Sequence, residues 1–165
     1  MKNINSYNIL SKYYKFIYNH QVSNEDSVNK YLDFIISNIN NFDRFLDIGC
    51  GTGIFTEKLS KNFNKNFGID PCEDMIKQAQ FNPKINYYNL YLNQFNESKF
   101  DLITSFSQVI NHLNNYNDLN DFIVQSSLKL NDNGILYFDI FNNEYFDYNE
   151  PSEIKRTLSQ NMYYS

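Results

Sequence analysis

The sequence LDIGCGTG at residues 46–53 constrains the fold of this chain more than any other segment. A short apolar run that is typical of a buried strand stops at Gly49, Gly51 and Gly53, and a helical spacing of apolar residues follows at once. Glycine permits a sharp turn and lets a ligand approach the main chain, while a helix that begins there offers free N–H groups. The segment therefore predicts a strand, a ligand-binding turn and a helix.

Short apolar segments alternate with helical patterns over the rest of the chain. We expect helices at 27–39, 73–80 and 120–130, and strands at 45–48, 67–70, 85–88, 100–106 and 135–141. Strands that alternate with helices imply βαβ units, and nearly continuous apolar strands indicate burial on both sides. The expected class is α/β, with a mostly parallel sheet and helices on both faces.

Two other glycine-rich ligand loops fit the turn poorly. A dinucleotide-binding turn has the pattern G-x-G-x-x-G and would need glycine where the chain has Ile54. A P-loop ends in Gly-Lys followed by Ser or Thr, and the chain has no such sequence here. A glycine-rich turn that only serves packing stays open as an alternative.

The segment LDIGCGTG closely resembles the first motif of the S-adenosylmethionine-dependent methyltransferases of class I, including the acidic residue Asp47. Gly68–Met75 is similar to the G-x-D-x-S-x-x-M pattern of that family, with Cys72 where serine is usual. Lys99–Phe106 and Asp132–Leu136 are similar to its fourth-strand segment and to the turn before its fifth strand. The resemblance covers roughly residues 30–141 and implies a Rossmann-like methyltransferase fold with S-adenosyl-L-methionine as the cofactor.

The resemblance also implies a set of cofactor-binding residues. Asp70 follows the second strand, and its carboxylate would accept both ribose hydroxyl protons; helix capping is the alternative role. Met75 would pack near the adenine, with core packing as the alternative. The residues expected to bind the cofactor are Tyr14, Tyr18, Asp47, Gly49, Cys50, Gly51, Asp70, Pro71, Met75, Tyr91, Ser105 and Phe106.

One segment departs from the family pattern. The family usually has an acidic residue after the third strand that bonds the adenine amino group, whereas residues 89–95 (NLYLNQF) contain no carboxylate. Tyr91, Asn93 or a backbone carbonyl would have to replace it. Cys50 and Cys72 form no C-x-x-C pair and histidine is scarce, so we expect neither a metal site nor a disulfide framework.

Methyl transfer requires the protein to align the reactants and does not require a covalent bond to the protein. Methyl transfer is an in-line displacement, so the protein must place nucleophile, carbon and sulfur in one line. A base is needed only for a weakly acidic hydroxyl or to remove an ammonium proton. His112 follows the fourth strand, where open α/β sheets bind ligands, and is the candidate base or substrate-orienting residue. A loop histidine without such a role is the alternative, and His20 is the only other histidine.

The N-terminal segment YYKFIYNH at residues 13–20 resembles the opening of small-molecule methyltransferases, including the sugar-amine N-methyltransferases. By that resemblance Tyr14 and Tyr18 approach the methionine end of the cofactor; covering a helix interface is the alternative role. We expect one domain over 1–165, with an N-terminal helical lid at 1–40, a cofactor-binding core at 41–141 and a partial C-terminal extension at 142–165.

The composition excludes several partner classes. The net charge is −5 and the sequence has no basic cluster, which argues against nucleic acid as a partner. The N-terminus lacks the apolar region of a secretory signal, and no apolar run is long enough to span a membrane. We expect a reduced, cytoplasmic protein with no membrane partner that methylates a small-molecule amine or hydroxyl.

The C-terminal end predicts an incomplete sheet. The sheet of the family usually continues beyond a fifth strand, but residues 142–165 have room for about one more strand. An apolar fifth strand near an edge invites pairing with another chain, so we expect either a truncated version of a longer enzyme or a homo-oligomer that covers this edge. The alternative function is a cofactor-binding protein that is catalytically weak or depends on a partner.

Overall fold

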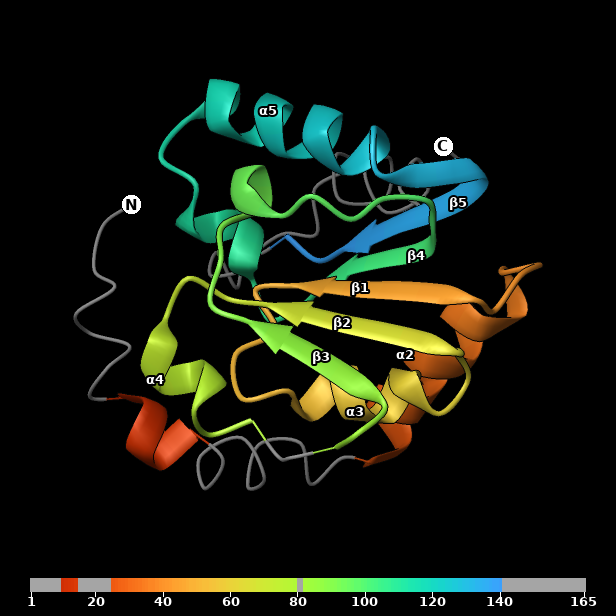
Figure 1. Ribbon diagram of the computed structural model, residues 1–165, viewed down its shortest axis with the longest axis horizontal. Helices are drawn as coiled ribbons and strands as arrows, with labels where there is room; N and C mark the ends of the chain where they lie inside the picture. The colour runs from red at the N-terminus through yellow and green to blue at the C-terminus, as the bar shows by residue number, and fades with distance from the viewer. Residues whose placement is uncertain (1–9, 15–24, 80–81, 141–165) are drawn as a thin grey trace, which may run out of the picture.

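The computed structural model describes residues 10–14, 25–79 and 82–140, and these contain a five-stranded parallel sheet (Figure 1). The spatial order of the strands is β3-β2-β1-β4-β5. The strands are β1 (Arg44–Ile48), β2 (Lys65–Ile69), β3 (Ile85–Tyr88), β4 (Phe100–Ser105) and β5 (Leu130–Phe138). The order reverses between β1 and β4, which is the place where open α/β sheets bind their ligands.

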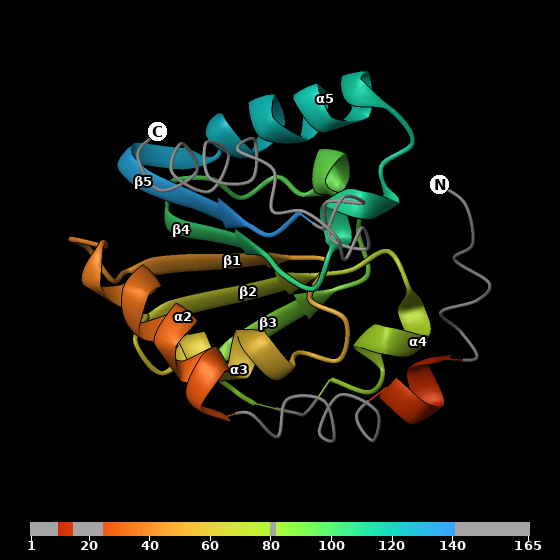
Figure 2. The same cartoon turned by 180° about the vertical axis from the view of Figure 1, so that it is seen from behind.

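Helices cover both faces of the sheet (Figures 1 and 2). The helices and helical turns are α2 (Glu25–Ser37), α3 (Ile54–Ser60), α4 (Glu73–Ile76), η1 (Leu92–Gln94), η2 (Val109–His112) and α5 (Tyr116–Ser127). Figure 2 shows α2 and α3 on one side of the sheet and α5 on the other, and residues 10–14 form a short helical segment near α4. The expected α/β architecture is confirmed.

Strand β1 supplies side chains to two separate cores because successive residues of a strand point to opposite faces. Leu46 and Ile48 of β1 belong to the cluster that includes Phe122 of α5. Phe45, between them in the sequence, belongs to the cluster that includes Ile35 of α2 and Leu59 of α3. Burial on both sides of the sheet explains why the strands are apolar. The parallel sheet was predicted from this apolar character.

Three elements differ from the prediction by more than two residues at a boundary. The helix expected at 120–130 begins at Tyr116, because the Asn115 side chain accepts a hydrogen bond from the backbone N–H of Asp118 (3.1 Å). The helix after Pro71 is only the short α4. The turn expected at 132–134 instead lies within β5 as a bulge, since Phe100 pairs with Leu130 and Leu102 pairs with Ile135.

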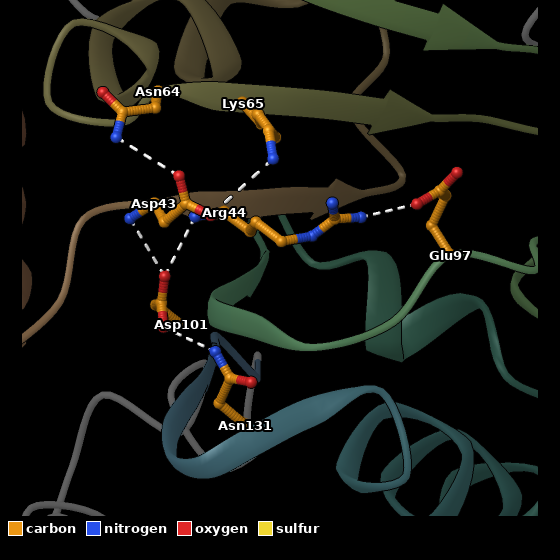
Figure 3. A network of polar contacts seen from close by, with 7 residues as sticks. All are labelled: Asp43, Arg44, Asn64, Lys65, Glu97, Asp101 and Asn131. Carbon is orange, nitrogen blue, oxygen red and sulfur yellow. Dashed lines mark hydrogen bonds and ion pairs between the residues drawn. The ribbon is translucent and has the colours of Figure 1, made fainter.

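A polar network fastens the amino ends of β1, β4 and β5 (Figure 3). The Asp101 carboxylate accepts the backbone N–H groups of Asp43 (3.0 Å) and Arg44 (2.9 Å) and the side-chain amide of Asn131 (2.7 Å). The Arg44 guanidinium pairs with Glu97 (2.5 Å) and lies over the rings of Phe67 and Phe100. The network joins three strands at the end of the sheet opposite the glycine turn.

Tyr18, His20, Phe141 and residues 142–165 lie outside the described residues. The predictions for the second N-terminal tyrosine, for the C-terminal extension and for a covered sheet edge therefore stay predictions. Among the strands that the structure describes, β5 is the last one on its side of the sheet.

Candidate functional site

The loop between β1 and α3 has the conformation that its glycines predict. Gly49, Gly51 and Gly53 have φ values of +71°, +53° and +79°, which other residues rarely adopt. A Cβ on Gly49 would lie 2.5 Å from Cγ2 of Val109, and a Cβ on Gly53 would lie 2.2 Å from the hydroxyl of Tyr87. Both conformation and close packing therefore require glycine at these two positions.

The Asp70 carboxylate lies at the carboxyl end of β2 and holds this loop. One oxygen accepts the backbone N–H of Gly51 (2.9 Å) and the other accepts that of Cys72 (2.8 Å). Burial raises the pKa of Asp70, and these two N–H groups partly offset that rise by stabilising the charged form. Each carboxylate oxygen can accept a second hydrogen bond, so the aspartate can hold the loop and bind a ligand hydroxyl together.

Asp47 lies beneath the loop and bonds to neighbouring elements. Its oxygens accept hydrogen bonds from the hydroxyls of Thr56 in α3 (2.6 Å) and Thr104 in β4 (2.8 Å). Burial is the main cause that raises the pKa of Asp47 to about 6, and the two hydroxyls oppose it. These contacts tie β1, α3 and β4 together below the turn.

A cavity of about 670 Å³ opens at the carboxyl ends of β1, β2, β3 and β4. Its size is typical of a site for a ligand as large as a nucleoside derivative. Of the residues predicted from the sequence, those that line it are Tyr14, Gly49, Gly51, Asp70, Pro71, Met75, Tyr91, Phe106 and His112. The structure therefore brings together residues that lie far apart in the sequence.

Ser105 and Asp47 are absent from the lining of this cavity. The Ser105 side chain is buried and donates a hydrogen bond to the carbonyl oxygen of Ile48 (3.0 Å), which joins the ends of β4 and β1. Asp47 and Cys50 line a second, much smaller cavity beside the same loop. Burial raises the pKa of the Cys50 thiol, so this side chain is a neutral packing group.

The smaller cavity holds about 20 Å³, which is room for a single water or a group of similar size. The rings of Tyr14, Phe55 and Phe106 lie around it. The Thr52 hydroxyl also lines it and is buried without a hydrogen-bond partner among the described residues. A buried hydroxyl without a partner is costly, so this position suits a polar group of a ligand or a water.

The segment after β3 lacks a carboxylate, as the sequence indicated. The side-chain amide of Asn89 donates to the carbonyl oxygen of Asp70 (2.9 Å), which fixes the loop to the end of β2. The backbone N–H of Tyr91 donates to Oε1 of Gln94 (2.9 Å) and begins η1. Tyr91 and Asn93, the two side chains proposed as substitutes for the missing acid, both line the large cavity.

One wall of the large cavity was missed by the sequence analysis. It comes from α5 and the segment before it, and its residues are Asn114, Asp118, Asp121, Phe122 and Gln125. Asn114 donates from both its backbone and its side chain to Asp118 (3.0 Å each), and these bonds lower the pKa of Asp118. The Asn-x-x-Asp capping sequence at 115–118 was the available signal, because it sets the true start of the helix.

The charge of the large cavity is one-sided. Its lining includes the carboxylates of Asp70, Asp118 and Asp121 and, within the described part of the chain, neither lysine nor arginine. Such a wall attracts a cationic ligand and offers no lysine or arginine to a pyrophosphate. No group of three potential ligands gathers to hold a metal ion in the described ranges. None of the helices described there could cross a membrane.

His112 and Tyr14 approach the cavity from different elements. His112 ends η2, which follows β4, and its imidazole lines the cavity while staying open to solvent. Tyr14 belongs to the N-terminal helical segment, and its ring lies 3.9 Å from the position of a Cβ on Gly51. A general base candidate and an aromatic residue thus lie on the same cavity as the glycine loop.

The chain has clear relatives. A family model described as "Methyltransferase domain" matches residues 18–164. The ubiquinone biosynthesis O-methyltransferase of Pelagibacter ubique is 30% identical over 105 residues, which cover 60% of this chain and 42% of that protein. The chain thus spans less than half the length of this curated relative.

Solved structures agree on the fold. An S-adenosylmethionine-dependent methyltransferase from Clostridium acetobutylicum is 28% identical, with a TM-score of 0.68 over 82% of this chain and 60% of that one. An amino pentose methyltransferase from Micromonospora echinaspora is 23% identical, with a TM-score of 0.70 over 78% of this chain and 56% of that one. These matches confirm the Rossmann-like methyltransferase fold. Because the family model matches most of the length of this chain, the chain belongs to the S-adenosylmethionine-dependent methyltransferases.

Proposed function

We propose that this chain binds S-adenosylmethionine in the large cavity and transfers its methyl group to a small-molecule amine or hydroxyl. The observation that carries the proposal is the pairing of the glycine loop with Asp70, whose carboxylate bonds the loop and lines the cavity. The wall without lysine or arginine also supports a sulfonium nucleoside, which is cationic, over a dinucleotide.

The residues present fit this cofactor. The main chain of the loop is open at Gly51, where a Cβ would lie 3.9 Å from the Tyr14 ring, so a ligand can lie against it there. Asp70 offers further lone pairs to ribose hydroxyls, and Tyr91 or Asn93 offers a polar partner for the adenine amino group. The buried Thr52 hydroxyl is available to a polar group of the methionine portion. When bound, the cofactor supplies an activated methyl group.

The protein residues then supply alignment and proton transfer. Tyr14, Phe106 and His112 border the space beside the glycine loop, so they can orient an acceptor toward the cofactor. His112 is the proposed base, which takes the proton from a hydroxyl or from the ammonium that an attacking amine forms. The partial exposure of the cavity suits an acceptor that enters from solvent.

The acceptor stays open between an amine and a hydroxyl. The named relatives include an O-methyltransferase and, at the level of the fold, an amino pentose methyltransferase. The absence of a carboxylate after β3 favours the second candidate, a domain that binds the cofactor but is catalytically weak or partner-dependent. A cytoplasmic location, the absence of a nucleic-acid partner and a homo-oligomer stay predictions.

A transfer assay separates the two candidates. The purified chain is incubated with S-adenosylmethionine that carries a tritiated methyl group and with panels of amino sugars, hydroxylated aromatics and other small amines. We expect label in one acceptor class, with His112→Gln lowering kcat roughly 10²-fold or more. His20→Gln is the matched histidine control and should retain the rate. Cofactor binding without transfer to any panel would favour the second candidate, and no cofactor binding would refute the proposal.

A further inference from the structure

The loop that follows β4 is held in an unfavourable backbone conformation. Ser107 and Gln108 are consecutive, neither is glycine, and they have φ values of +62° and +64°. The left-handed region is strained for a residue with a Cβ, so two such residues in succession require a compensating interaction. Residues held in this way cluster at functional sites, and this pair borders the large cavity through Ser107.

Asp139, directly after β5, provides that interaction. Its carboxylate accepts the backbone N–H of Gln108 (3.0 Å), and the backbone of Ser107 also stabilises its charged form. The backbone N–H of Asp139 donates to the carbonyl oxygen of Ser105 (3.4 Å). The exits of β4 and β5 are therefore tied by bonds in both directions, with the carboxylate as the acceptor that orders the loop.

The loop that Asp139 holds reaches both halves of the site. Its next residue, Val109, packs so closely on Gly49 that a Cβ there would lie 2.5 Å from Val109 Cγ2. Val109 also begins η2, which ends at His112. A shift of Ser107 and Gln108 would therefore move the contact with the glycine loop and the imidazole together. Asp139 itself lines neither the large cavity nor the smaller one beside the glycine loop.

We infer that Asp139 is a positioning residue: by accepting the amide of Gln108 it fixes the wall of the cavity formed by Ser107, Val109 and His112. The binding test of this inference rests on the proposed function. The inference adds to that function a side chain that shapes the cavity without touching the ligand. The carboxylate acts through the backbone of the loop, and an isosteric amide would keep only one, uncharged, acceptor oxygen in its place. The NH2 group of an asparagine side chain is a hydrogen-bond donor, and the backbone N–H groups of the loop that face it are donors too.

The test compares Asp139→Asn with Asp101→Asn, using S-adenosylhomocysteine as the probe. Both native carboxylates accept backbone N–H groups of a neighbouring segment, but Asp101 does so at the opposite end of the sheet (Figure 3). In calorimetric titrations of folded protein, Asp139→Asn should weaken binding about tenfold or more, as loss of a charged hydrogen bond implies. Asp101→Asn should lower the urea midpoint and leave the dissociation constant within about twofold. Unchanged binding in Asp139→Asn, or an equal loss in both, would overturn the inference.

Two further measurements keep the inference testable if the variant fails to fold or the probe fails to bind. Adding Gln108→Gly to Asp139→Asn should restore part of the lost affinity, because glycine adopts a positive φ without strain; no rescue in a folded double variant contradicts the role. In the unmodified chain, the Gln108 amide should exchange with deuterium at least about tenfold more slowly than an unstructured peptide. Rapid exchange of that amide contradicts the contact itself, even where the proposed function has failed for other reasons.

Discussion

The buried carboxylate of Asp47 makes the stability of this chain depend on pH in a direction that can be worked out from the structure. Its pKa of about 6 in the folded chain lies above the ordinary value of 3.8. The folded state therefore binds the proton more tightly than the unfolded state, and stability falls as pH rises from about 4 to about 6. The difference corresponds to about 3 kcal/mol, of which about 2 kcal/mol falls between pH 4.5 and pH 7.5.

The assay is urea unfolding of the wild type and Asp47→Asn at those two pH values. Asparagine keeps the shape but does not ionise, so its stability relative to the wild type should improve by about 2 kcal/mol at the higher pH. Thr104→Val removes a hydroxyl that stabilises the charged form, so that variant should lose more stability above pH 6 than the wild type does. A stability difference between wild type and Asp47→Asn that does not change with pH would refute the reasoning.

Three further predictions concern ligand binding and the loop. Asp70→Ala should weaken S-adenosylhomocysteine binding roughly 10- to 100-fold in a calorimetric titration, because it removes both the loop bond and the ribose acceptor; affinity within twofold of wild type would contradict the ribose assignment. Gly49→Ala should lower the free energy of unfolding in urea by about 2 kcal/mol or more, because Val109 occupies the space that the Cβ would need and φ is positive at this residue. An unchanged urea midpoint would show that the loop rearranges to accommodate the Cβ. Asp121→Asn should weaken binding of cationic S-adenosylmethionine a few-fold more than binding of S-adenosylhomocysteine at low salt, and 0.5 M salt should reduce the difference; equal losses for both ligands would exclude an electrostatic role.

The sheet and the core of the site could be predicted because local patterns determine them. Residues other than glycine rarely adopt the backbone conformation of Gly49, Gly51 and Gly53, so the turn is visible in the sequence itself. Asp70 was predicted to bind the cofactor from its place after the second strand and from the resemblance to the family pattern, and it lines the large cavity. The third strand was predicted to begin at Ile85 and to reach at least Tyr88, and β3 has these bounds.

Other features depend on contacts between segments that are distant in the sequence. Nothing local indicates that Asp118 and Asp121 face the cavity, because that depends on how α5 packs across the sheet. The bonds from Thr56 and Thr104 to Asp47 join three elements, so the sequence showed an acidic residue but not its partners. The bulge in β5 depends on Gly134, where a Cβ would lie 2.5 Å from the carbonyl oxygen of Phe100 in the neighbouring strand.

The central claim is that the glycine loop and Asp70 form a site for S-adenosylmethionine. Calorimetric titration of the wild-type chain with S-adenosylhomocysteine, and separately with NAD, tests it most directly. We predict saturable binding of S-adenosylhomocysteine at one site per chain, and no measurable binding of NAD at the same concentrations, because the described wall of the cavity has no lysine or arginine to pair with a pyrophosphate. Binding of NAD, or no binding of S-adenosylhomocysteine by folded protein, would contradict the account.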